Sequence, residues 1–158
     1  MNTTEALENS HVMVIQSVDD LPESEWDVPG VCGDWSVKDI IAHLTSYEHL
    51  VVDVLNTFLG KQVTPHVFKF INDSAGFNDS EVEARKYHTA QQVLDEYQDA
   101  QVQSTSLLAQ IPAEKVQQAG TMPWYGEQHC LADLVNMVYA HTCEHCTQIV
   151  HFREKINE

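Results

Sequence analysis

Residues Leu131–Ile156 read LADLVNMVYAHTCEHCTQIVHFREKI, a long run without Gly or Pro whose apolar residues recur at helical spacing. At about 100° per residue, one face of the predicted helix carries Leu131, Leu134, Val138, Ile149, Phe152 and Ile156. We therefore expect a long amphipathic helix that packs this face against the rest of the chain. It is the strongest pattern in the sequence.

His141 and His145 interrupt this apolar face at positions where the pattern favours Leu or Val. A buried ring nitrogen without a partner costs about 1–3 kcal/mol, and two protonated imidazoles one helical turn apart repel each other. A divalent metal ion removes both problems, because neutral imidazoles at i and i+4 can bind one ion. The alternative is a pair of core histidines hydrogen-bonded to carbonyl or carboxylate groups. The short H-x-x-x-H spacing does not by itself decide between the two interpretations.

A second helix is predicted over the run VKDIIAHLTSYEHLVVDVLNTFLG, residues 37–60, which extends to a Gly at its C-terminal end. Ser36 and Asp39 have the spacing of a capping box, in which each residue's side chain binds the other's backbone N–H, and Trp35 is placed to act as a hydrophobic staple. Gly60 follows the last apolar residues, as is typical of a helix C-terminus. The start and the end of this helix are therefore both marked in the sequence.

This second helix also carries an inward-facing histidine. Its apolar face consists of Val37, Ile40, Leu44, Tyr47, Val51, Val54, Leu55 and Phe58. His43 lies at the edge of that face, between Ile40 and Tyr47, and is the candidate third ligand for a metal ion. His49 points away from the face and is expected to be exposed.

A third helix is predicted over residues 79–111, where the apolar residues again recur at helical spacing. Two capping boxes are compatible with this segment, one formed by Ser80 and Glu83 and the other by Thr89 and Gln92. Because the second box lies inside the segment, we expect a kink or a break near residue 88.

The remaining segments complete the outline. Residues 3–18 predict a first helix, in which His11 is expected to pack at the helix flank rather than to bind anything. Residues 60–78 are irregular in composition and predict a crossover or a lid over a site. Trp124 and Tyr125 form a bulky pair in the last connection, where they can act as a clamp beside a pocket or as a plug at one end of the molecule.

Four helical patterns and no convincing alternation with period two predict an all-α fold, a four-helix bundle. The chain has 158 residues, which fits a single domain over residues 1–158 with enough length to bury a core. The connection between the second and third helices is the longest and is expected to be a crossover.

The charge of the chain excludes several classes of partner. Lys and Arg number 8 against 24 Asp and Glu, which gives a net charge of −16. Binding to nucleic acid or to an anionic membrane needs clustered cations, so neither is expected. No apolar run is long enough for a membrane span, and the N-terminus lacks a signal pattern, so we expect a cytoplasmic protein.

The four cysteines are too few for a disulfide scaffold and are expected to be reduced. Cys143 and Cys146 form a C-x-x-C motif beside the histidines, which suggests a zinc knuckle or a redox pair as a rival site. Helical geometry opposes this, because Cys143 lies about 160–200° around the helix from the two histidines. We therefore expect Cys143 to face outward and Cys146 to lie at the flank. No second C-x-x-C is present to complete a zinc site.

Three stretches of the sequence resemble the DinB-like superfamily, which includes bacterial thiol-dependent S-transferases and mycothiol-dependent maleylpyruvate isomerases. Residues 33–44, GDWSVKDIIAHL, are similar to the family's G-x-W-S-V-x-D-x-x-x-H-L opening of the second helix. Residues 78–85 and 89–94, NDSEVEAR and TAQQVL, resemble the start of its third helix. Residues 141–145, HTCEH, with Gln148 and Ile149, resemble its closing H-x-x-x-H-x-x-Q-I.

The resemblance implies an up-down-down-up bundle with a long crossover between the second and third helices. It also implies one divalent metal ion held by three histidines, here His43, His141 and His145. Zinc and nickel both suit imidazole ligands, and the sequence does not choose between them. Three protein ligands leave a coordination position open, which is typical of a catalytic site. The sequence assigns no general acid or base.

By this resemblance the chain is a metal-dependent enzyme that transfers a low-molecular-weight thiol to a small electrophilic substrate, or isomerises the substrate through a thiol adduct. The alternative is a non-catalytic bundle that binds and sequesters a small molecule as a protective protein, because membership of a superfamily specifies the fold better than the reaction. A homodimer is compatible with an amphipathic bundle, but the sequence defines no interface.

Overall fold

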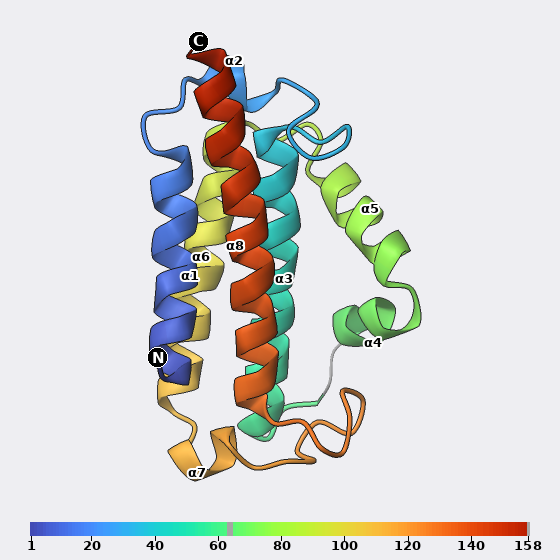
Figure 1. Cartoon of the computed structure of the whole chain (residues 1–158). Coiled ribbons are helices and arrows are strands. Elements are labelled where there is room, and N and C mark those ends of the chain that lie inside the picture. Colours follow the sequence, from blue (N-terminus) through green and yellow to red (C-terminus); the bar gives the residue numbers. More distant parts are fainter. Residues whose placement is uncertain (63–64, 158) are drawn as a thin grey trace.

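The computed structural model describes residues 1–62 and 65–157, and within these ranges the chain is all-α, with eight helices and no strand (Figure 1). The four long helices match the four predicted helical regions, and their bounds are α1 Thr3–Val18, α3 Val37–Phe58, α6 Ala90–Ala109 and α8 Leu131–Ile156. The short helices lie in the connections, and their bounds are α2 Glu23–Trp26, α4 Pro65–Asn72, α5 Ser74–Ala84 and α7 Ala113–Val116.

The four long helices pack side by side as a bundle (Figure 1). The most extensive contacts join α3 to α6 and α1 to α8, and a smaller contact joins α3 to α8. The prediction of an all-α bundle is therefore confirmed. In the part of the chain that the structure describes, no helix combines the length and the apolar character that a membrane crossing requires.

The ends of the long helices follow from local sequence. In the predicted capping box, the Asp39 backbone N–H donates to Ser36 Oγ at 3.2 Å, and the Ser36 N–H donates to the Asp39 carboxylate at 3.1 Å. Thr89 and Gln92 form the same pair of bonds at the start of α6, at 2.8 and 3.1 Å. Each box satisfies two backbone donors that have no partner within the helix.

The crossover between α3 and α6 is more ordered than its composition predicts. Residues 60–78 were expected to be irregular, but residues 65–72 form α4 and residues 74–84 form α5. The reason is local: Pro65 opens α4, where its missing N–H is harmless, and the Asp73 side chain accepts from the Gly76 N–H at 3.0 Å and caps α5. Positions 63–64 lie outside the described residues.

The predicted third helix is interrupted, as expected near residue 88. α5 ends at Ala84 and α6 begins at Ala90, so the break at Thr89 is confirmed. The prediction of a capping box at Ser80 is wrong, because Ser80 lies inside α5 and its hydroxyl donates to the Phe77 carbonyl at 3.2 Å.

The buried apolar side chains form two clusters that follow each other along the bundle. On α3, Ile40 belongs to one cluster and Tyr47 to the other. On α8, Val138 belongs to the same cluster as Tyr47, and Ile149 belongs to the same cluster as Ile40. His43, His141 and His145 therefore lie where the two clusters meet, between flanking segments that burial of apolar side chains holds in place.

Candidate metal centre

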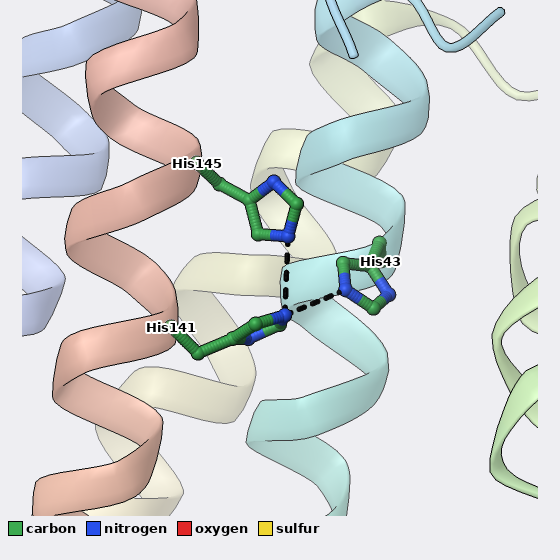
Figure 2. Close-up of side chains that lie close together, drawn as sticks. All are labelled: His43, His141 and His145. Atoms are coloured by element: carbon green, nitrogen blue, oxygen red, sulfur yellow. Dashed lines mark hydrogen bonds between the residues drawn. The ribbon is translucent and has the colours of Figure 1, made fainter. Parts of the chain in front are cut away.

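His43 of α3 and His141 and His145 of α8 point toward one another between the two helices (Figure 2). His141 Nε2 lies 3.0 Å from His43 Nε2 and 3.1 Å from His145 Nε2. Each ring offers one nitrogen to a group whose members all lie within 4.8 Å of one another. The structure thus brings together the three residues that the sequence analysis selected.

Burial keeps the rings of His43 and His141 in the neutral form. His43 is 2% exposed and His145 is 7% exposed, whereas His141 is half-buried. Burial, followed by the proximity of His141 and His145, lowers the pKa of His43 to about 3. Burial and His145 lower the pKa of His141 to about 4. At neutral pH these two imidazoles are therefore uncharged, which is the form that binds a metal ion.

Gln148 fixes the tautomer of His145. His145 Nδ1 donates to Gln148 Oε1 at 2.8 Å, so the lone pair of the ring is on Nε2, the nitrogen that faces the other two histidines. A partner of this kind on the far nitrogen is typical of histidines that bind metals. Gln148 follows His145 by three residues on α8 and lies on the same side of the helix.

Hydrogen bonding alone does not satisfy the three nitrogens. Because His145 Nε2 carries a lone pair, a hydrogen bond between His145 and His141 needs a proton on His141 Nε2. His141 Nε2 also faces His43 Nε2, and its single proton cannot form a full hydrogen bond to both neighbours. The Nδ1 atoms of His43 and His141 are buried and have no hydrogen-bond partner in the described structure. An arrangement of mutually hydrogen-bonded histidines without an ion therefore leaves at least one of the three facing Nε2 atoms without a full hydrogen bond.

A divalent cation fits the same donor set. With metal–nitrogen distances of about 2.0–2.1 Å, two ligand nitrogens lie about 2.9 Å apart at a 90° angle and about 3.4 Å apart at the tetrahedral angle. The two observed Nε2–Nε2 separations, 3.0 and 3.1 Å, fall between these values. These two spacings, the neutral forms of His43 and His141, and the orientation of His145 suit one shared ion.

Aromatic rings enclose the histidines. The Trp35 ring centroid lies 4.9 Å from that of His43, and Tyr47 stacks on His141 with centroids 4.5 Å apart. Burial raises the pKa of Tyr47, an effect that a hydrogen bond from the Asn78 side chain partly offsets. The Tyr47 hydroxyl therefore keeps its proton at neutral pH and is available as a donor.

Two of these neighbours were not recognised as part of the site from sequence. Trp35 was interpreted only as a helix staple, although it stands in the stretch that resembles the family's second-helix motif. Asn78 belongs to the weaker third-helix motif, and α5 carries it next to Tyr47. Their positions within motifs were the only available signal, because neither side chain type indicates a metal site by itself.

The C-x-x-C motif is separate from this centre. Cys143 Sγ lies 3.7 Å from Met13 Sδ of α1, and Cys146 is buried at 5% exposure. The prediction that Cys143 faces outward is wrong, since α1 packs on that side of α8. Among the described residues, no candidate metal group includes a cysteine, and all four cysteines are free.

Histidines away from the centre pair with carboxylates, and two of these pairs correct predictions made from the sequence. His11 is 1% exposed and binds Glu48 in the core, so its predicted place at a helix flank is wrong. His49 was expected to be exposed, but its side chain is only 31% exposed and its Nε2 lies 2.7 Å from Glu96. A pattern on one helix does not show which neighbouring helix will cover a residue.

Together, the fold and the site define a helical-bundle protein with a three-histidine candidate metal centre between two long helices. The sequence profile of the DinB superfamily matches residues 6–149, and the chain belongs to this superfamily. The resemblance inferred from the sequence motifs is thereby confirmed.

The fold has a counterpart among solved structures. A crystal structure of a protein from Streptococcus pneumoniae, determined by the Northeast Structural Genomics Consortium, is similar with a TM-score of 0.82. The match covers 98% of this chain and 91% of that chain at 14% sequence identity, so the similarity concerns the fold alone. A search of curated proteins found no match.

Proposed function

We propose that the protein is a metal-dependent enzyme that transfers a low-molecular-weight thiol to a small electrophile, or isomerises the electrophile through a thiol adduct. The observation that supports this most directly is the convergence of three imidazoles between α3 and α8, where His141 Nε2 lies 3.0 Å from His43 Nε2 and 3.1 Å from His145 Nε2. Membership of the DinB superfamily supports the same class of reaction.

In this proposal His43, His141 and His145 hold one divalent ion, zinc or nickel. When bound, such an ion supplies Lewis-acid chemistry that lowers the pKa of a thiol or a water molecule reaching it. Gln148 holds the His145 ring in the required tautomer. Tyr47 covers one side of His141 and offers a protonated hydroxyl to whatever occupies the site.

The reaction needs neither an oxidant nor a reductant. The thiol sulfur forms a bond to an electrophilic carbon with its own electron pair, and the thiol proton is released. In a substitution the leaving group departs with the electron pair of the bond that breaks, and in an addition that pair takes up a proton. A thiolate is the stronger nucleophile, so lowering the pKa of the thiol accelerates the step.

The first experiment measures metal content. Protein purified without added chelator is expected to contain about one zinc or nickel ion per chain by elemental analysis, and the paired substitution His141→Ala and His145→Ala is expected to remove it. His151→Ala is the matched control, because His151 is an exposed histidine on the same helix. Metal content that survives the paired substitution would rule out the proposed ligands.

The second experiment measures catalysis. Metal-loaded protein is incubated with bacillithiol, mycothiol or glutathione and a panel of electrophiles, and adduct formation is followed by mass spectrometry. Turnover that exceeds one adduct per chain and disappears with the paired histidine substitution supports the enzyme. Stoichiometric, saturating loss of free electrophile without turnover would instead support a protein that sequesters a small molecule.

Three further expectations form part of the same proposal. The four long helices follow the up-down-down-up order of the family, an order that the pairing of α1 with α8 and of α3 with α6 supports. The protein acts in the cytoplasm on a small-molecule substrate, without nucleic acid or membrane partners. A homodimer is compatible with the bundle, and light scattering at several concentrations measures it directly.

A further inference from the structure

A small apolar cavity lies between α3, α4 and α8, next to the candidate metal centre. Its volume is about 30 Å³, and its walls include Val51 of α3, Phe70 of α4 and Val138 of α8. Trp124 and Tyr125 from the last connection also line it. Among the described residues, no charged side chain lines the cavity.

Tyr47 connects this cavity to the three histidines. Its ring lines the cavity, and its centroid lies 4.5 Å from that of His141 and 4.7 Å from that of His43. Tyr47 follows His43 by one turn of α3, and Val138 precedes His141 by about one turn of α8. The cavity therefore begins about 5 Å along the bundle from the histidines.

We propose that this cavity is the subsite that receives an uncharged, apolar group of the small electrophile. The inference depends on the proposed function, because it takes the histidines as the place of reaction. Burying a carboxylate or an ammonium group among these side chains without a partner carries a large free-energy penalty. The substrate class is therefore an electrophile with a small alkyl or halogen substituent about one helical turn from the reacting carbon, and a carboxylate group is excluded from this subsite.

The size of the cavity sets which groups enter without rearrangement. A water molecule needs about 10–15 Å³ of such space, so about 30 Å³ accommodates two or three groups of that size, such as an ethyl or propyl chain or a halogen atom. Trp124 and Tyr125 are half-buried residues of a connection, with ring centroids 5.7 Å apart. A larger substituent needs one of these rings to turn outward, so Trp124 limits the size of the substrate.

The binding test uses metal-free protein, so that its readout is independent of catalysis. Methyl resonances of Val51 and Val138 are followed by NMR while 1-butanol or butyrate is added. We expect 1-butanol to shift these resonances in a saturable way and butyrate to bind at least ten-fold more weakly. Equal binding of the two probes, or no saturable shift with either, would overturn the inference.

Two substitutions locate the site. Val138→Phe fills the cavity and is expected to weaken 1-butanol binding at least ten-fold, whereas Leu94→Phe is the matched control because Leu94 packs against the other apolar cluster. Trp124→Ala opens the wall and is expected to allow toluene to bind in addition. If Val138→Phe does not fold, Trp124→Ala provides the test by itself. A Trp124→Ala variant that still does not bind toluene would contradict the inference.

The outcomes separate this inference from the proposed function. Protein that binds 1-butanol in the cavity but holds no metal ion at the histidines would remove the proposed reaction and leave a small-molecule pocket. Protein that holds a metal ion but does not distinguish 1-butanol from butyrate would keep the centre and remove the apolar subsite.

Discussion

Tyr47 of α3 and His141 of α8 stack face to face, with ring centroids 4.5 Å apart and planes inclined by 22°. The stack packs a core tyrosine against a candidate metal ligand, and the same tyrosine ring lines the apolar cavity. Tyr47 also contacts His43, at 4.7 Å between centroids. Tyr47 therefore lies between the candidate metal centre and the proposed substituent subsite, and its ring helps to position the His141 ring.

The stack leads to a prediction about metal affinity. Tyr47→Phe keeps the ring and removes only the hydroxyl, so we expect the zinc dissociation constant to stay within about three-fold of the wild-type value. Tyr47→Ala frees the His141 ring, and we expect zinc binding to weaken about ten-fold, as for other losses of support around a ligand. Competition with a chromogenic chelator measures both constants. Equal affinity in the alanine and phenylalanine variants would show that the stack does not position His141.

Gln148 provides a second prediction, because it accepts the hydrogen bond from His145 Nδ1. Gln148→Leu removes the acceptor and is expected to weaken zinc binding about 10–100-fold. Gln148→Glu keeps an acceptor oxygen at the same place and is expected to retain the affinity. The same chelator competition applies, with thermal unfolding of the metal-free variants as a control for folding. A Leu variant that binds zinc like the wild type would exclude this role.

A buried pair elsewhere in the bundle is expected to matter for stability rather than for the site. His11 of α1 binds Glu48 of α3, both side chains are almost fully buried, and Ser104 of α6 donates to Glu48 at 3.2 Å. Three helices are thus joined by one polar group, and removing it leaves the buried His11 Nε2 without its partner, whereas the Ser104 hydroxyl can still donate to the Gln101 carbonyl at 3.1 Å. Glu48→Ala is expected to lower the free energy of unfolding by about 1–3 kcal/mol or more.

A double-mutant cycle on that pair, measured by urea unfolding, tests the assignment. His11→Ala combined with Glu48→Ala is expected to cost less than the sum of the single substitutions, by about 1–3 kcal/mol. The half-exposed pair His49 and Glu96 serves as a control and is expected to show a coupling below about 1 kcal/mol. Additive effects at His11 and Glu48 would contradict the prediction.

The pH dependence of stability is predicted at Glu96. Arg85 Nε and a terminal guanidinium nitrogen donate to its carboxylate at 2.9 and 2.7 Å, and these hydrogen bonds are the main reason that the pKa of Glu96 is lowered to about 2. A lowered carboxyl pKa means that the unfolded state binds the proton first as the solution is acidified. The stabilisation is therefore present above about pH 4.5 and is lost as the pH falls toward 2.

Comparison with Glu96→Gln isolates this contribution. Because the carboxylate is partly solvent-exposed, we expect the wild type to exceed the variant by only about 1 kcal/mol near neutral pH, with the difference disappearing between pH 4.5 and pH 2. Urea unfolding across that range measures it. A difference that stays constant with pH would show that the Arg85 contact does not act through the charge of Glu96.

Most of the helices could be predicted because their signals are local. The capping boxes at Ser36 and Thr89 involve atoms within one turn of chain, and the apolar periodicity of α8 involves residues of one helix. The prediction of an irregular crossover was wrong for a local reason as well. The Asp73 side chain caps α5 and stabilises a helix in a segment whose Gly-containing composition predicts none. Helix periodicity also selected His43, His141 and His145 as candidates, and the resemblance to the family assigned all three to one metal ion.

The sequence by itself determined that the chain forms long amphipathic helices, and that His141 and His145 share a face on one of them while His43 faces inward on another. Only the tertiary structure decided that the three Nε2 atoms meet, that Tyr47 and Trp35 enclose them, that α1 covers Cys143, and that an apolar cavity begins beside them. The physical reason is range: helix periodicity is set by bonds between neighbouring turns, whereas the rotation and register of one helix against another depend on packing between residues far apart in the chain.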